Sequence, residues 1–256
     1  MKHVGLNVAA DLVFTAAYNG VGAGFVIVTA DDPDMHSSQN EQDNRRYAQF
    51  AKIPLIEPAD SQECKDFMKE AYDISERFDI PVLFRTTTRV SHSKSLVTFG
   101  ERQEITPARY VRNIPKNVCT PGNARIHRPE LEEKLKKLEA YANTSPLNSM
   151  ELNSGKIGVI SASIAYQYAK EVFPQDTSFL KLGFTWPLPL DLIRAFASNV
   201  ETLYVVEELE PFMEEQLKAA GIPCIGKQVI PPMYELNPEI VRRGVFHTEP
   251  EVAKLE

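Results

Sequence analysis

The chain has 256 residues, of which 43% are hydrophobic and 25% charged, so it can bury one or two ordinary hydrophobic cores and is expected to be globular. Its net charge of −7 comes without a basic stripe or an aromatic-plus-arginine cluster, which argues against nucleic acid as a partner. No apolar run approaches the roughly 20 residues that cross a membrane, and the N-terminus lacks the layout of a signal peptide. We therefore expect a cytoplasmic protein.

The cysteines point to no shared chemistry. Cys64, Cys119 and Cys224 are far apart in the sequence and odd in number. Neither a disulfide framework nor a local metal site follows from such spacing. We expect the three thiols to be reduced and mostly structural.

The first part of the chain predicts a parallel sheet. Residues 24–30 (GFVIVTA) form a continuous apolar run, typical of a strand that is buried on both faces. A second such strand is predicted at residues 79–87. Between them, residues 61–78 carry apolar side chains at helical spacing, although Ser61 and Cys64 make only a poor capping box at its start. This helix would be the crossover between two parallel strands.

From about residue 91 to residue 154 the pattern weakens. Residues 112–130 are rich in turn formers, and residues 128–147 predict one charged amphipathic helix. We interpret this region as a connector whose helix docks on a domain surface. We expect the chain to divide into a first domain (1–110), a connector (111–154) and a second domain (155–256).

The second domain alternates strictly between the two kinds of pattern. Strands are predicted at 155–163, 178–184 and 201–209, and helices at 164–173, 188–197 and 211–221. Such alternation is typical of a parallel sheet that is covered by helices. The predicted fold class is therefore α/β, with two parallel-sheet units.

A long polar segment follows the first strand. Beyond Thr29, about twenty residues are packed with acidic, amide, hydroxyl and histidine side chains. Ligands of open parallel sheets bind at the carboxyl ends of the strands, where this loop begins. Arg45 and Arg46 lie near the start of the next helix, where an anion would also feel the helix dipole. From these residues alone, a long solvated loop with a helix cap is the favoured alternative.

Five stretches together resemble one enzyme family over nearly the whole chain. They are MKHVGLNVAAD, VIVTADDPDMHSSQNEQDNRRYAQFAKIPLIEPADSQE, DIPVLFRTTTRVSHS, LKLGFTWPLP and LYVVEELEPFMEEQ. They are similar to the alpha subunit of indolepyruvate ferredoxin oxidoreductase. The HSSQNEQDNR run is the specific signature. The resemblance implies the second half of a pyrimidine-binding thiamine-diphosphate domain, followed by a transketolase C-terminal-like domain.

The resemblance also implies an activity. The family decarboxylates aryl pyruvates such as indolepyruvate oxidatively to acyl-CoA and passes the electrons to ferredoxin. The complete enzyme would use thiamine diphosphate with magnesium, and iron–sulfur clusters, and would pair with a beta subunit in a dimer of heterodimers. The family's activating glutamate, its Gly-Asp-Gly motif and its cysteine-rich tail do not occur in this chain. We therefore expect an internal fragment that is inactive alone.

The N-terminal residues are implied to face the cofactor. Gly5 suits such a position because a residue without a Cβ lets the backbone approach a ligand closely. The alternative is a frayed terminus. The residues expected to form a loop that faces the pyrimidine ring and the 2-oxoacid are Lys2, His3, Gly5 and Asn7.

The HSSQNEQDNR segment is implied to line the substrate side of the same cleft. His36 would stabilise negative charge on the intermediate or move a proton, because histidine changes charge near neutral pH; a hydrogen-bonded loop histidine is the alternative. Arg45 would pair with the substrate carboxylate through its guanidinium fork; the alternative is a surface or interface salt bridge. The other expected substrate-binding residues are Ser37, Ser38, Gln39 and Asn40.

Four further residues have weaker assignments. Arg89 and His92 follow the second strand and would lie near the site or at a subunit interface. Glu207 and Glu208 end the last strand of the second domain, and in related domains such carboxylates are more often structural than catalytic.

Two other classes of function stay open at this point. One is a component of another thiamine-diphosphate enzyme, either transketolase-like or a 2-oxoacid dehydrogenase. The other is a non-catalytic assembly module whose sheet edges pair with other chains.

Overall fold

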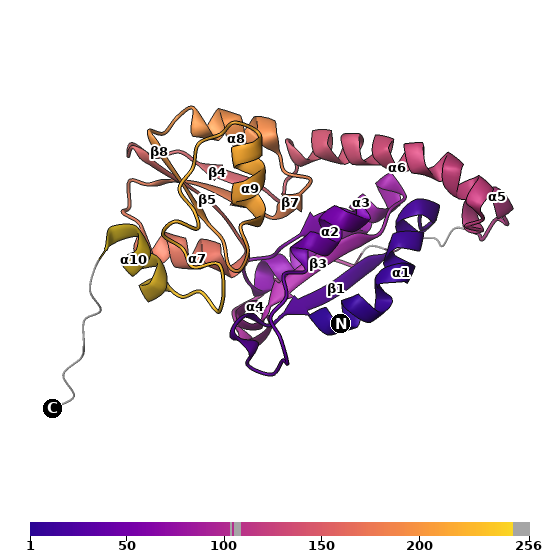
Figure 1. Cartoon of the computed structure of the whole chain (residues 1–256), viewed down its shortest axis with the longest axis horizontal. Coiled ribbons are helices and arrows are strands. Elements are labelled where there is room, and N and C mark those ends of the chain that lie inside the picture. The colour runs from indigo at the N-terminus through magenta and orange to yellow at the C-terminus, as the bar shows by residue number, and fades with distance from the viewer. Residues whose placement is uncertain (103, 105–108, 248–256) are drawn as a thin grey trace.

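The computed structural model describes residues 1–102, 104 and 109–247. Within them the strands form two four-stranded sheets (Figure 1). This arrangement confirms the predicted α/β class with two sheet units.

The first sheet has the order β1-β3-β2-β7. Strands β1, β3 and β2 are parallel, and β7 pairs antiparallel with β2. The predicted strands at 24–30 and 79–87 are therefore neighbours, with Val26 opposite Val82 and Asp31 opposite Thr87. The strand bounds are β1 (Val26–Asp31), β2 (Leu55–Ile56), β3 (Val82–Thr87) and β7 (Phe184–Trp186).

The second sheet has the order β4-β6-β5-β8. Its three predicted strands are parallel, and β4 pairs antiparallel with β6 at the edge. The strand bounds are β4 (Ser149–Glu151), β5 (Ile157–Ala162), β6 (Ser178–Leu182) and β8 (Thr202–Val206).

The helices of the first unit include the predicted crossover, α3, with the bounds that its apolar spacing indicates. The cap at its start differs from the prediction. Asp60 is the N-cap and accepts from the Glu63 N–H, while the Glu63 carboxylate accepts from the Ala59 N–H. An Asp therefore takes the place of Ser61 in the capping box. The helices are α1 (His3–Asn19), η1 (Pro33–Met35), α2 (Arg45–Ala51), α3 (Ser61–Phe78) and α4 (Thr88–His92).

The helix of the expected connector begins earlier than its charge pattern indicates. It starts at Pro121, because Thr120 caps the Asn123 N–H and proline is tolerated in the first turn. It continues through Pro129, so much of the apparently turn-rich stretch is helical. The remaining helices are α5 (Ile114–Asn117), α6 (Pro121–Ala142), α7 (Ser163–Val172), α8 (Leu190–Ala197), α9 (Phe212–Ala219) and α10 (Pro238–Phe246).

Two strands cross the expected boundaries between the domains. Strand β4 lies within residues 111–154 but belongs to the second sheet, and β7 lies within residues 155–256 but extends the first. One hydrophobic core also runs through both units and includes Phe84, Phe184 and Phe196. Each sheet therefore contains a strand from outside its expected domain, and one hydrophobic core joins both sheets. The division of the chain into two folding units stays a prediction.

In the part of the chain that the structure describes, no helix is long and apolar enough to span a membrane.

Candidate functional site

The polar loop after β1 is organised around one carboxylate. Asp32 accepts hydrogen bonds from the Ser37 N–H (2.9 Å), from the Thr88 hydroxyl (2.9 Å) and from the Ser38 hydroxyl. Burial alone would raise the pKa of Asp32, but these hydrogen bonds and the charge of Lys2 bring it down to about 2. The loop is thus tied to the carboxyl ends of both β1 and β3.

Several of the expected substrate-binding side chains are exposed on this loop. The side chains of Ser37, Gln39 and Asn40 lie open to solvent, whereas Ser38 is half-buried and its hydroxyl is used by Asp32. The His36 side chain is 39% exposed, and its Nε2 lies 3.4 Å from Glu235 Oε2 of the second unit. Glu235 also accepts from the Arg89 guanidinium. The structure therefore brings these loop residues to one edge of the first sheet.

The expectation of an N-terminal cofactor loop is wrong in one respect, because α1 begins at His3. His3 is fully buried, and its Nε2 lies 3.2 Å from the Asn40 carbonyl oxygen. Lys2 donates to the Ser37 carbonyl, and Asn7 donates to Gln42 Oε1 at 2.6 Å.

Gly5 lies on the same first turns of α1. A Cβ added there would meet Met1 Cβ at 3.3 Å, so the missing side chain makes room for Met1. The first turns of α1 therefore contact the polar loop through hydrogen bonds, and they do not form a loop themselves.

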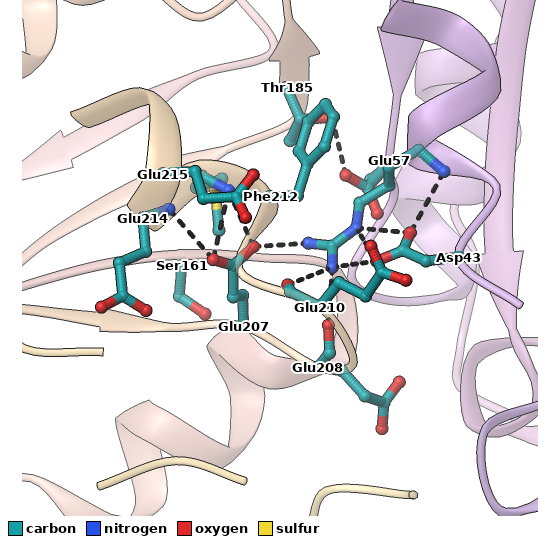
Figure 2. A network of polar contacts seen from close by, with 12 residues as sticks. Asp43, Glu57, Ser161, Thr185, Glu207, Glu208, Glu210, Phe212, Glu214 and Glu215 are labelled. Atoms are coloured by element: carbon teal, nitrogen blue, oxygen red, sulfur yellow. Dashed lines mark hydrogen bonds and ion pairs between the residues drawn. The ribbon is translucent and has the colours of Figure 1, made fainter. Parts of the chain in front are cut away.

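Arg45 lies elsewhere than expected. It is 2% exposed, and its guanidinium donates to Asp43 Oδ1 (2.8 Å), to Glu207 Oε2 (2.6 Å) and to the Glu208 carbonyl oxygen (2.7 Å). Figure 2 shows Asp43 and Glu207 converging from the two units. All its nitrogens are occupied by protein partners, so the expected substrate-carboxylate contact is corrected to a buried ionic link between the units.

A second buried arginine extends this network. Arg85 donates to Asp31 Oδ2 at 2.6 Å and to Glu57, whose other oxygen accepts from the Thr185 hydroxyl at 2.6 Å. Thr185 lies on β7, so this chain of contacts helps to join that strand, from the later part of the sequence, to the first sheet. Neither Glu57 nor Arg85 is among the site residues expected from the sequence. The available signal was a single charged residue within each of two apolar runs, IPLIEPA and PVLFRTT.

The two carboxylates that follow β8, Glu207 and Glu208, both have raised pKa values but have different partners. Burial raises the pKa of Glu207, although Arg45 and Lys227 oppose the shift. Burial also raises the pKa of Glu208 to about 7, against the hydrogen bond from the Leu236 N–H. Arg45 donates to the carbonyl oxygen of Glu208, whereas the Glu208 carboxylate accepts from the Leu236 N–H. Glu208 is therefore a buried acid whose ionisation costs stability.

Replacing Glu208 with Gln should stabilise the chain at pH 8 by about 1–3 kcal/mol and change little at pH 4.5. The folded-state pKa of about 7 lies above the ordinary 4.5, so the stability contributed by the carboxyl is present below pH 4.5 and is lost as the pH rises through 7. Glutamine imitates the protonated acid at every pH. Urea unfolding of both proteins at the two pH values measures the difference.

Glu210→Gln is the matched control, since the Glu210 side chain is 54% exposed. It should shift stability by less than about 0.5 kcal/mol at either pH. An equal gain from E208Q at pH 4.5 and pH 8 would show that ionisation of Glu208 is not the cause.

Comparison with known proteins supports the resemblance. No family model matches the chain. Indolepyruvate oxidoreductase subunit IorA is 44% identical in Methanothermobacter marburgensis, 43% in Archaeoglobus fulgidus and 42% in Pyrococcus horikoshii. Each match covers 96% of this chain but only 40–42% of the relative. The resemblance expected from the sequence is therefore confirmed, and the chain spans about two fifths of the length of these relatives.

Solved structures show the same fold. A 2-oxoglutarate:ferredoxin oxidoreductase from Magnetococcus marinus, with 2-oxoglutarate, coenzyme A and succinyl-CoA bound, aligns with a TM-score of 0.68 at 12% identity, over 96% of this chain and 52% of that one. A split-gene transketolase, described as an inactive beta4 tetramer, aligns with a TM-score of 0.54 at 13% identity, over 94% and 79%. Both neighbours agree with the predicted α/β fold of two units.

Proposed function

We propose that this chain is part of the alpha subunit of an indolepyruvate oxidoreductase, which decarboxylates aryl pyruvates oxidatively to acyl-CoA with ferredoxin as the electron acceptor. The observation that carries the proposal is the 40–44% identity to IorA subunits over 96% of the chain. That aligned length takes in both sheets and nearly all of the described chain. The partner would be the beta subunit, in a cytoplasmic dimer of heterodimers.

Within this proposal, the polar loop faces the 2-oxoacid. His36 is the group for proton movement or for stabilising negative charge at the reacting carbonyl, since its ring is accessible and held at a strand end. The exposed Ser37, Gln39 and Asn40 supply hydrogen bonds to the substrate. Arg45 has no part in this step, because its guanidinium is buried and paired.

The described residues do not by themselves fit thiamine diphosphate, magnesium or an iron–sulfur cluster. They contain no group of three His, Cys, Asp or Glu side chains that could hold a metal ion. Lys2, His3 and Asn7 all contact the polar loop. We propose that the cofactors are bound by other segments of the longer protein, and that the chain has no turnover alone.

The test is an assay of the full-length protein that contains this chain, assembled with its partner subunit. Ferredoxin reduction should require CoA, and kcat/KM should be at least about tenfold higher with indolepyruvate than with 2-oxoglutarate, because a single well-made pocket contact is worth a factor of this size. Equal or better use of 2-oxoglutarate would replace the substrate proposal. No ferredoxin reduction with any 2-oxoacid, in protein shown to be folded and loaded, would remove the activity.

A further inference from the structure

We infer that Glu235 of the second unit is a positioning residue for His36 and that the two units therefore build the candidate site together. This inference rests on the proposed role of His36. Glu235 is more than 190 residues from His36 in the sequence, lies after β8 and α9, and has no place among the residues that the resemblance assigns.

The contacts around Glu235 hold its carboxylate at one place. Glu235 Oε2 lies 3.4 Å from His36 Nε2, and the Arg89 guanidinium donates to both oxygens of the same carboxylate. The Glu235 side chain is 12% exposed, whereas that of His36 is 39% exposed. The carboxylate is thus shielded from water while the imidazole stays open on its other side, so the pair is better ordered than an ion pair on the surface.

The backbone on both sides of Glu235 is anchored as well. The Tyr234 N–H donates to both oxygens of Glu41 at 3.1 and 3.2 Å, and the Leu236 N–H donates to Glu208 Oε1 at 2.9 Å. Tyr234 has a φ of +65°, a conformation that a bulky residue rarely adopts. A strained backbone conformation persists where surrounding contacts hold it in place. Here the hydrogen bonds of Tyr234 and Leu236 hold the backbone on both sides of Glu235.

Glu41, on the polar loop, joins the loop to the segment that carries Glu235. Its Oε1 also accepts from the Asp34 N–H at 2.9 Å, so the loop on both sides of His36 is tied to fixed points. The imidazole has its Nε2 near Glu235 and remains 39% exposed. Holding a reacting group in one orientation lowers the entropic part of the barrier, so Glu235 acts on the reaction through His36 and does not touch the substrate.

The first experiment uses the 256-residue chain and measures backbone hydrogen exchange. Glu235→Gln keeps the shape of the side chain but removes its charge, so the amides of residues 34–42 should exchange about three- to tenfold faster. Glu239→Gln, at an exposed position at the start of α10, is the matched control and should leave these amides unchanged. Unchanged exchange in E235Q would overturn the claim that Glu235 holds the loop.

The second experiment separates positioning from mere structural support, in the full-length subunit assembled with its partner. E235Q should lower kcat about three- to tenfold while KM stays within twofold, and E239Q should change neither. In the His36→Ala background, E235Q should cause no further loss, because Glu235 acts only through His36. Additive losses in the double variant would overturn the inference.

The two proposals fail in different ways. If H36A keeps full activity, the proposed role of His36 falls, and the inference that depends on it falls too. If H36A loses activity while E235Q alone does not, the role of His36 stands and the positioning role of Glu235 is wrong.

Discussion

Replacing Arg45 with Met should lower the free energy of unfolding by about 3–5 kcal/mol. The Arg45 side chain is 3% exposed and pairs with the carboxylates of Asp43 and Glu207, whose side chains are 1% and 2% exposed. Its removal leaves two carboxylates in a site where burial already raises the pKa of Glu207. A methionine fills similar volume, so the loss would come from uncompensated charge and not from a cavity. Loss of the carbonyl contacts at Glu208 and Glu210 adds to it.

The neighbouring arginine is the matched control for this prediction. Arg46 is 32% exposed and pairs with Glu210 and Glu215, which are each 54% exposed. Arg46→Met should therefore cost less than about 1 kcal/mol. Urea unfolding followed by the fluorescence of Trp186 suits both variants, since this single tryptophan lies on β7 with its ring 6.3 Å from that of Phe212. Similar losses in the two variants would mean that Arg45 does not carry the link between the units.

Replacing His36 or Gln39 with Ala in the full-length subunit should lower activity by about tenfold or more. Both side chains are exposed on the loop, so neither contributes much to folding. The free energy of unfolding should change by less than about 0.5 kcal/mol. Activity would be measured as indolepyruvate-dependent ferredoxin reduction, and stability by thermal unfolding of the same preparations.

Ser38→Ala provides the contrast within the same loop. The Ser38 hydroxyl donates to Asp32, which organises the loop, so this variant should lose about 1 kcal/mol of stability. The expected pattern is a loss of activity without a loss of stability at positions 36 and 39, and a loss of stability at position 38. If H36A and Q39A instead unfold more easily while each folded molecule keeps its activity, the loop is a structural cap.

The sequence alone was sufficient wherever the signal was local. Helix α3 has the bounds that its apolar spacing indicates, and β1 and β3 lie where continuous apolar runs predict them. Strict alternation of strand and helix patterns likewise predicted the three parallel strands of the second sheet. Periodicity reports which face of an element is buried, and that property depends on residues a few positions apart. The placement of the polar loop at a strand end followed from the same local reading.

Other features depend on contacts between distant residues, and only the tertiary structure decided them. Arg45 looks like a free cation at a helix start until Glu207, 162 residues later, is placed against it. Strand β7 joins the first sheet although its sequence lies within the second unit, and Glu235 meets His36 only after both units have packed. Amphipathic pattern and helix capping carry no information about which partner will neutralise a buried charge. The partner depends on which opposite charges the assembled core places nearby, because a charge that is buried without a partner costs much free energy.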